Sequence, residues 1–315
     1  MVKVYTTELA GRKLELEFGK YCGQANGSVI VRLGDTVVMV NATASEKARE
    51  GQDFFPLSVD FEEKMYSVGK IPGGFIKREG RPSEKATLTS RLIDRPLRPL
   101  FNKGMRNDVQ VVATVLSVEQ DVPPDIPAMI GASAAIAVSD IPWAGPIGGV
   151  SVGLVNGEVV INPNMEQRAV SKLNLTVAGT DEAVLMVEAG AQEISEADML
   201  RAILTGHEEI KKLVAFQKQI VAEIGKPKRD FPVVETGEDV KAAVRADFYG
   251  RCEWVFEAFD RHERGDRELI VKNEAHEKYT EQFEGRMSEV DDALYYLNKE
   301  IMRKKILEQG VRPDG

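Results

Sequence analysis

Alternating apolar and polar residues predict that the chain begins with β-strands. Residues 14–18 alternate with a period of two, which indicates a strand with one face in water. The β-rich runs 29–33 and 37–41 flank Gly34-Asp35, a pairing typical of a hairpin. A polar loop is expected over 46–53, and residues 54–61 return to the strand pattern.

The next part of the chain mixes strands with helices. Residues 108–118 are nearly all apolar, which predicts a central strand. After the proline-rich break at 123–127, the small apolar residues of 128–139 suit a helix pressed against a sheet. Two hairpins are predicted, over 147–161 and 173–187, the first turning at Asn156-Gly157.

A long amphipathic helix is predicted after these hairpins. Ser195 and Asp198 form a variant capping box at its start, and apolar residues keep helical spacing until Gly225. His207 lies within that apolar stripe, with no acid or thiol partner nearby in sequence. We therefore interpret it as a core or boundary histidine and not as a catalytic one.

The C-terminal part has a different character. Pro227, Pro232 and Gly237 indicate a linker, after which apolar stripes over 240–259 and 288–301 predict helices. Between them lies a polar stretch with both signs of charge. These features predict a small all-α domain, and a spacer that packs against the first domain is favoured over an active site.

Composition places the chain among ordinary globular proteins. Its 315 residues suffice for two or three domains, and 43% are apolar and 29% charged. No apolar run approaches the ~20 residues of a membrane span, and the first residues lack a secretion signal pattern. Two distant cysteines and three histidines offer no metal-ligand cluster, and a reducing cytoplasm is the expected compartment.

Charge is distributed unevenly. The chain has a net charge of -9, but residues 69–98 carry eight positive and three negative side chains, a local charge of +5. Pro72-Gly73-Gly74 predicts a flexible turn, followed by an aromatic residue beside cations, an arrangement that suits single-stranded nucleic acid. A basic segment on an acidic protein is typical of a surface that binds a polyanion.

A helix capped by Ser83 is expected to follow the turn and to end near Arg95, because Pro96 and Pro99 come next. The alternative is a solvated charged surface in which Asp94 pairs with Arg91 or Arg98. The predicted RNA-contacting residues are Phe75, Lys77, Arg78, Arg81, Arg91, Arg95 and Arg98.

The basic segment also carries a resemblance. The runs K-I-P-G-G-F-I-K-R-E-G-R-P-S-E and R-L-I-D-R-P-L-R-P-L-F, with D-I-P-A-M-I-G-A-S-A-A and L-T-V-A-G-T-D-E-A-V-L-M-V-E-A further on, resemble the first RNase PH-like module of the bacterial polynucleotide phosphorylase family. In that family the loop after P-G-G usually reads Phe-Phe-Arg-Arg and lines the entrance pore of a trimeric ring. Here Ile76 replaces the second aromatic residue, while the charge is kept.

The resemblance implies an α+β fold and a domain order. It predicts an RNase PH-like module over 1–226, with subdomains 1–145 and 146–226, and a linker over 227–237. An all-α domain over 238–310 follows, and V-R-P-D-G at 311–315 resembles the opening of a second RNase PH-like module. We accordingly expect an N-terminal fragment of a longer protein.

The resemblance also implies an activity, namely processive 3'-to-5' phosphorolysis of single-stranded RNA during mRNA turnover. Inorganic phosphate is the attacking substrate, nucleoside diphosphates are the products, and Mg²⁺ is the cofactor. The family's metal ligands lie in the second module, and the corresponding positions here are Arg168, Asn174 and Thr176. The serine-rich phosphate loop corresponds to Pro123-Pro124-Asp125. We therefore expect no catalytic and no metal-binding residue in this chain, and we interpret Asp260 and Asp266 as surface acids.

The partners implied are RNA, two further copies in a homotrimer and proteins of an RNA-decay complex, in the cytoplasm and without a membrane. Two other hypotheses remain open from the residues alone. The chain could be a stand-alone, non-catalytic RNase PH-like RNA-binding subunit. It could also be a scaffold whose basic segment binds an acidic protein.

Overall fold

A computed structural model describes residues 2–49 and 51–315. Met1 and Glu50 lie outside the described residues, the second of them within the predicted loop 46–53. The chain divides into two compact units, of which the first extends to Val233 and the second spans Val234–Gly315. The predicted fold class, an α+β module followed by an all-α domain, is confirmed.

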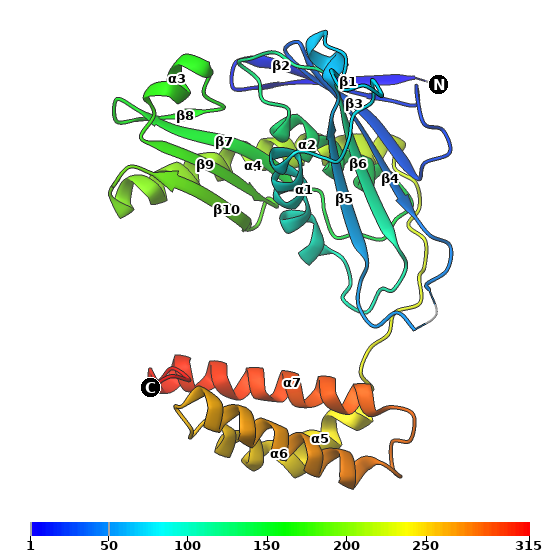
Figure 1. Ribbon diagram of the computed structural model, residues 1–315, viewed down its shortest axis with the longest axis vertical. Coiled ribbons are helices and arrows are strands. Elements are labelled where there is room, and N and C mark those ends of the chain that lie inside the picture. The colour runs from blue at the N-terminus through cyan, green and yellow to red at the C-terminus, as the bar shows by residue number, and fades with distance from the viewer. Residues whose placement is uncertain (1, 50) are drawn as a thin grey trace. The chain divides into compact units, whose positions relative to one another are not determined.

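The first unit contains a six-stranded sheet with the order β1-β2-β3-β4-β6-β5 (Figure 1). Neighbouring strands are antiparallel except β5 and β6, which run parallel. Because parallel neighbours need a crossover, the segment between β5 and β6 leaves the sheet and contains the basic residues. The strands are β1 (Lys3–Leu9), β2 (Arg12–Phe18), β3 (Gly27–Leu33), β4 (Thr36–Ala44), β5 (Leu57–Glu63) and β6 (Val109–Ser117).

A second, four-stranded antiparallel sheet has the order β10-β9-β7-β8. Its first hairpin turns at Asn156 (φ 52°) and Gly157 (φ 83°), so both turn residues have the left-handed backbone that such a tight hairpin needs. The hairpin prediction is confirmed. The elements are β7 (Gly148–Val155), β8 (Glu158–Ile161), α3 (Met165–Val170), β9 (Leu173–Gly179) and β10 (Val184–Ala191).

Helix α2 (Asp125–Val138) joins the two sheets in one core. Every residue from Ile126 to Val138 is buried, and the helix packs on β3, β4 and β6 of one sheet and on β7 of the other. A side chain at Gly131 would meet Val40 at 2.6 Å and Val31 at 2.8 Å, so glycine permits this close approach.

Helix α4 (Glu196–Ile224) begins where the sequence predicts, because Ser195 accepts a hydrogen bond from the Asp198 amide. It packs against β7 and β9. His207 is buried, and its Nε2 lies 2.9 Å from the carbonyl oxygen of Thr180. The histidine therefore has the boundary position that the apolar stripe indicates.

The segment predicted as a linker is divided by the structure. Lys228 Nζ donates to the carbonyls of Ile136, Ala137 and Ser139 at the end of α2, and burial lowers its pKa. Phe231 is buried in the first unit's core. Residues up to Val233 thus belong to the first unit. Lys228 satisfies backbone carbonyls of that unit, and Phe231 fills space in its core.

The second unit is all helical. It contains α5 (Glu238–Val255), α6 (Arg261–Tyr279) and α7 (Met287–Lys304), followed by a π turn, η3 (Lys305–Gln309). Its core includes Cys252, whose pKa burial raises to about 11, whereas Cys22 in the first unit is exposed. Among residues 2–49 and 51–315, no helix combines the length and apolar character needed to cross a membrane.

Candidate nucleic-acid interface

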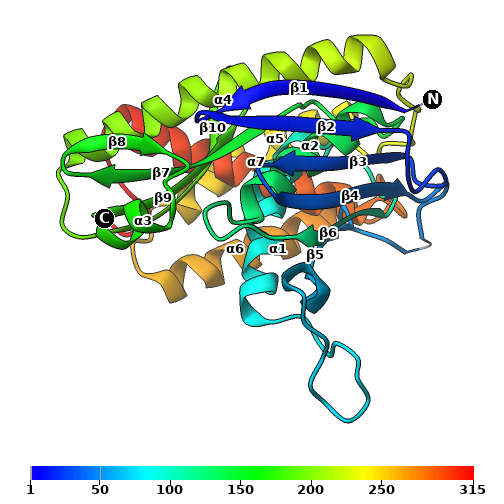
Figure 2. The same ribbon diagram turned by 90° about the horizontal axis from the view of Figure 1, so that it is seen from above.

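The basic segment begins as a loop whose two ends are held together. Turn η1 (Met65–Val68) ends at Gly69, which has a φ of 69°. Glu79 Oε1 accepts a hydrogen bond of 2.7 Å from the Met65 amide, and Glu79 Oε2 lies 3.6 Å from Lys64 Nζ. This clamp closes the loop 69–78, which projects away from the sheets (Figure 2).

The loop presents an aromatic ring beside free cations. Phe75 is completely exposed, at 102% of its reference area, and the Ile76 side chain next to it is 69% exposed. Lys77, Arg78 and Arg81 are exposed, and none of their side chains has a hydrogen bond or ion pair with a residue that the structure describes. The ring and the charges are therefore available to a partner.

Helix α1 (Glu84–Leu97) follows and is fixed at both ends. Ser83 accepts a 3.1 Å hydrogen bond from the Ala86 amide, as predicted. The expected end near Arg95 is wrong by two residues, because the Arg98 amide still bonds to the Asp94 carbonyl beyond Pro96. Loss of one amide donor in the last turn therefore does not end this helix.

The three arginines of this helix have different environments. Arg91 is exposed and has no partner among the described residues. Arg95 pairs with Glu188 on β10. Arg98 forms two contacts with Asp94, at 2.6 and 2.9 Å, and also donates to the Leu57 carbonyl. The local ion pair weighed as an alternative thus exists at Arg98. The residues whose side chains remain free are Phe75, Lys77, Arg78, Arg81 and Arg91, which we call the free set.

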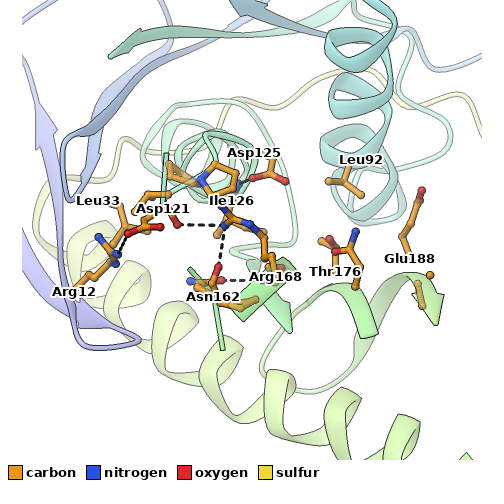
Figure 3. Close-up of a pocket in the computed structure, with 18 residues that line it drawn as sticks. Arg12, Leu33, Leu92, Asp121, Asp125, Ile126, Asn162, Arg168, Thr176 and Glu188 are labelled. Carbon is orange, nitrogen blue, oxygen red and sulfur yellow. Dashed lines mark hydrogen bonds and ion pairs between the residues drawn. The ribbon is translucent and has the colours of Figure 1, made fainter. Parts of the chain in front are cut away.

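A pocket of about 420 Å³ lies between the two sheets, close to α1. Figure 3 shows that Arg12, Asp125, Arg168 and Thr176 come to it from separate elements. Arg168 donates to the carbonyls of Gln120, Asp121 and Pro163, at 2.8 to 3.3 Å. The three positions predicted to correspond to metal ligands therefore line a single cavity.

Sequence reasoning missed several members of this pocket, including Arg12 and Asn162. Arg12 reaches it from β2, and Asn162 from the turn after β8, where its φ is 47°. The Asn162 Oδ1 accepts from the Ser151 amide, while its Nδ2 is buried without a partner among the described residues. Linear spacing offers no signal for such residues, because the fold alone brings them together.

Comparison with known proteins places these features in a family. Residues 10–142 match a model described as "3' exoribonuclease family, domain 1", and residues 145–209 match domain 2 of the same family. Residues 239–315 match "Polyribonucleotide nucleotidyltransferase, RNA binding domain". The chain is 56% identical over 313 residues to the polyribonucleotide nucleotidyltransferase of Caldicellulosiruptor saccharolyticus, and 56% identical over 316 to that of Clostridioides difficile.

The chain belongs to the polyribonucleotide nucleotidyltransferase family.

The two alignments cover 99% of this chain but only 45% of each nucleotidyltransferase, so the chain spans about half the length of these relatives. The solved structure of rice Rrp46 shares the fold, with a TM-score of 0.53 at 16% identity. That alignment covers 70% of this chain and 94% of the rice protein.

The residues that line this pocket do not fit a Mg²⁺ ion. Asp121 accepts from the Met165 amide and lies 3.7 Å from Arg12, and Asp125 accepts from the Ile126 amide. Burial raises the pKa of Asp125, which opposes the charged form that a metal requires. Among residues 2–49 and 51–315, no group of three or more His, Cys, Asp or Glu side chains could hold a metal ion.

Proposed function

We propose that this chain is the RNA-binding and ring-forming part of a processive, phosphorolytic 3'-to-5' exoribonuclease. The complete enzyme degrades single-stranded RNA to nucleoside diphosphates during mRNA turnover in the cytoplasm. It acts as a homotrimer and can join other proteins of RNA decay. Family membership supports the reaction class, and the free set carries the RNA-binding role of this chain.

The loop suits a single strand for a physical reason. A base that is not paired can stack on the exposed ring of Phe75, while Lys77 and Arg78 neutralise phosphates. These cations have no partner among the described residues, so no internal ion pair has to break when RNA binds. The clamp formed by Glu79 limits how far the loop must be ordered on binding.

The reaction itself is proposed to depend on residues outside this chain. Phosphorolysis needs a divalent ion to neutralise crowded oxyanions, and carboxylates to hold that ion. In the pocket, Arg168 occupies a predicted ligand position, and the neighbouring acids already accept hydrogen bonds or pair with arginine. The description of the model that matches residues 239–315 supports a second RNA contact in the helical unit.

The test uses the purified 315-residue chain. Its affinity for a fluorescein-labelled 30-nucleotide oligo(A) is measured by fluorescence anisotropy, with a duplex of equal length as the control. We expect tighter binding of the single strand, because a paired base cannot stack on Phe75. Absence of RNA binding at low salt would refute the proposed role.

A parallel reaction contains poly(A), inorganic phosphate and Mg²⁺. We expect no release of nucleoside diphosphate, and robust turnover would show that this chain is catalytic by itself. Light scattering on the complete protein measures its oligomeric state, for which the proposal predicts a trimer.

A further inference from the structure

A groove lies on the face of α7 that is turned away from the core of the second unit. The helix buries Val290, Leu294, Leu297 and Ile301 in the core of the second unit. The groove lies on another side of the helix and continues onto η3. It is lined by Tyr296, Lys299, Glu300, Arg303, Lys304, Leu307 and Glu308.

The cations of this groove are unusual within their unit. Residues 234–315, all of which the structure describes, contain 14 Lys and Arg against 20 Asp and Glu. Because acids outnumber cations here, most of the Lys and Arg side chains have a hydrogen-bond or ion-pair partner. Lys299, Arg303 and the distant Arg261 are the exceptions, because their side chains have no hydrogen bond or ion pair inside this range. Two of the three free cations thus lie one helical turn apart in a single groove.

One of the two acids that line the groove, Glu300, is already neutralised. Arg245 on α5 forms a bidentate pair with Glu300, at 2.7 and 2.8 Å, and this pairing lowers the pKa of Glu300. Lys299, Arg303 and Lys304 outnumber the remaining acid, Glu308, so the groove keeps a net positive charge although the unit as a whole is acidic.

Exposed aromatic and apolar surface accompanies these charges. The Tyr296 side chain is 46% exposed and the Tyr295 side chain 62%, and their rings meet edge to face with centroids 5.3 Å apart. At the other end of the groove the Leu307 side chain is 77% exposed. A rigid aromatic pair beside two free cations offers a stacking surface and a phosphate contact within the same groove.

We propose that this α7 groove binds single-stranded RNA, with Lys299 and Arg303 on phosphates and Tyr296 stacked against a base. The proposal deepens the proposed function, on which it rests, by assigning the RNA contact of the helical unit to one face. RNA is favoured over an acidic protein as the partner because a base can use the exposed tyrosine ring and the charge together.

The experiment compares three variants of the full chain in oligo(A) titrations at several salt concentrations. Lys299→Ala/Arg303→Ala should lower the slope of log K against log[salt] by about 1.4, since each phosphate contact contributes ~0.7 on a single strand. Arg303→Ala alone should lower it by about 0.7. The matched control, Arg261→Ala, removes one equally unpaired cation of the same unit and should leave the slope unchanged.

Photocrosslinking gives an independent measurement. RNA carrying 4-thiouridine is irradiated with the chain, and mass spectrometry locates the adduct, which we expect on the peptide that contains Tyr295 and Tyr296. An unchanged slope in the double variant, or adducts confined to other peptides, would overturn the groove assignment. If the Lys77→Ala/Arg78→Ala variant still weakens binding in that case, the proposed function stands without the groove; if neither variant has an effect, both fail.

Discussion

Replacing Lys77 and Arg78 by alanine tests the role of the exposed loop most directly. Both side chains are exposed and make no ion pair or hydrogen bond with a described residue, so the change removes charge and no internal contact. Lys77 has a φ of 50°, which is equally unfavourable for alanine, and the backbone strain is therefore unchanged. The unfolding midpoint of the variant should match that of the parent chain.

The expected effect follows from the number of phosphates that are no longer neutralised. Two contacts at ~0.7 each lower the slope of log K against log[salt] by about 1.4. Between 50 and 200 mM salt, the parent chain should then lose about sevenfold more affinity for oligo(A) than the variant. Anisotropy titrations at four or five salt concentrations resolve such a difference.

A matched control comes from α4. Lys211 and Lys212 are also adjacent, and each is paired with a glutamate three residues earlier. Their double alanine variant removes the same formal charge from the same unit and should keep the parental slope. Equal slopes for the parent and for Lys77→Ala/Arg78→Ala would refute RNA binding by the loop. An equal drop in slope for the control variant would show that the effect comes from net charge alone.

Three further predictions concern single side chains. Phe75→Ala should weaken oligo(A) binding by ~1–3 kcal/mol without lowering the thermal midpoint, since the ring stacks on no residue that the structure describes; unchanged affinity would exclude stacking. Arg98→Ala should instead lower the free energy of unfolding by about 1–3 kcal/mol in urea titrations, because the Leu57 carbonyl loses its donor, and a specific loss of RNA affinity would contradict this structural role. The contact with Arg286 lowers the pKa of Asp239 to about 2, from ~3.9 in an unfolded chain. The ion pair therefore stabilises the fold above about pH 4, and this stabilisation is lost as the pH falls towards 2. Asp239→Asn should flatten this acid limb in the circular dichroism melting of the helical unit, and an unchanged limb would argue against the contact.

Short sequence patterns predicted the structure correctly where it depends on residues that are close together in the chain. Asn156-Gly157 adopts the left-handed backbone that the pair favours, and Ser195 caps its helix through an amide three residues away. Helix α6 gave no such signal, because charged residues occupy most of its positions and only Val271, Ala275 and Tyr279 are buried. Its start is capped by Asp260, an acid that the sequence alone indicated only as a surface residue.

Partner choice and the pocket could not be predicted in the same way. The sequence allows Asp94 to pair with Arg91 or with Arg98, and the position of the Leu57 carbonyl favours Arg98. Arg12 and Arg168 are far apart in the chain and meet at one cavity only because the two sheets pack around α2. Distances of this kind depend on the completed fold, which composition and spacing do not contain.

The contrast between the two thiols gives the chain an internal reporter. Cys22 is open to solvent, whereas Cys252 is enclosed by the core of the helical unit and its thiolate is disfavoured. A maleimide dye added to the native chain should therefore attach at a single position. Uptake of a second dye then measures how often the three-helix unit opens, separately from the larger unit, without any engineered label.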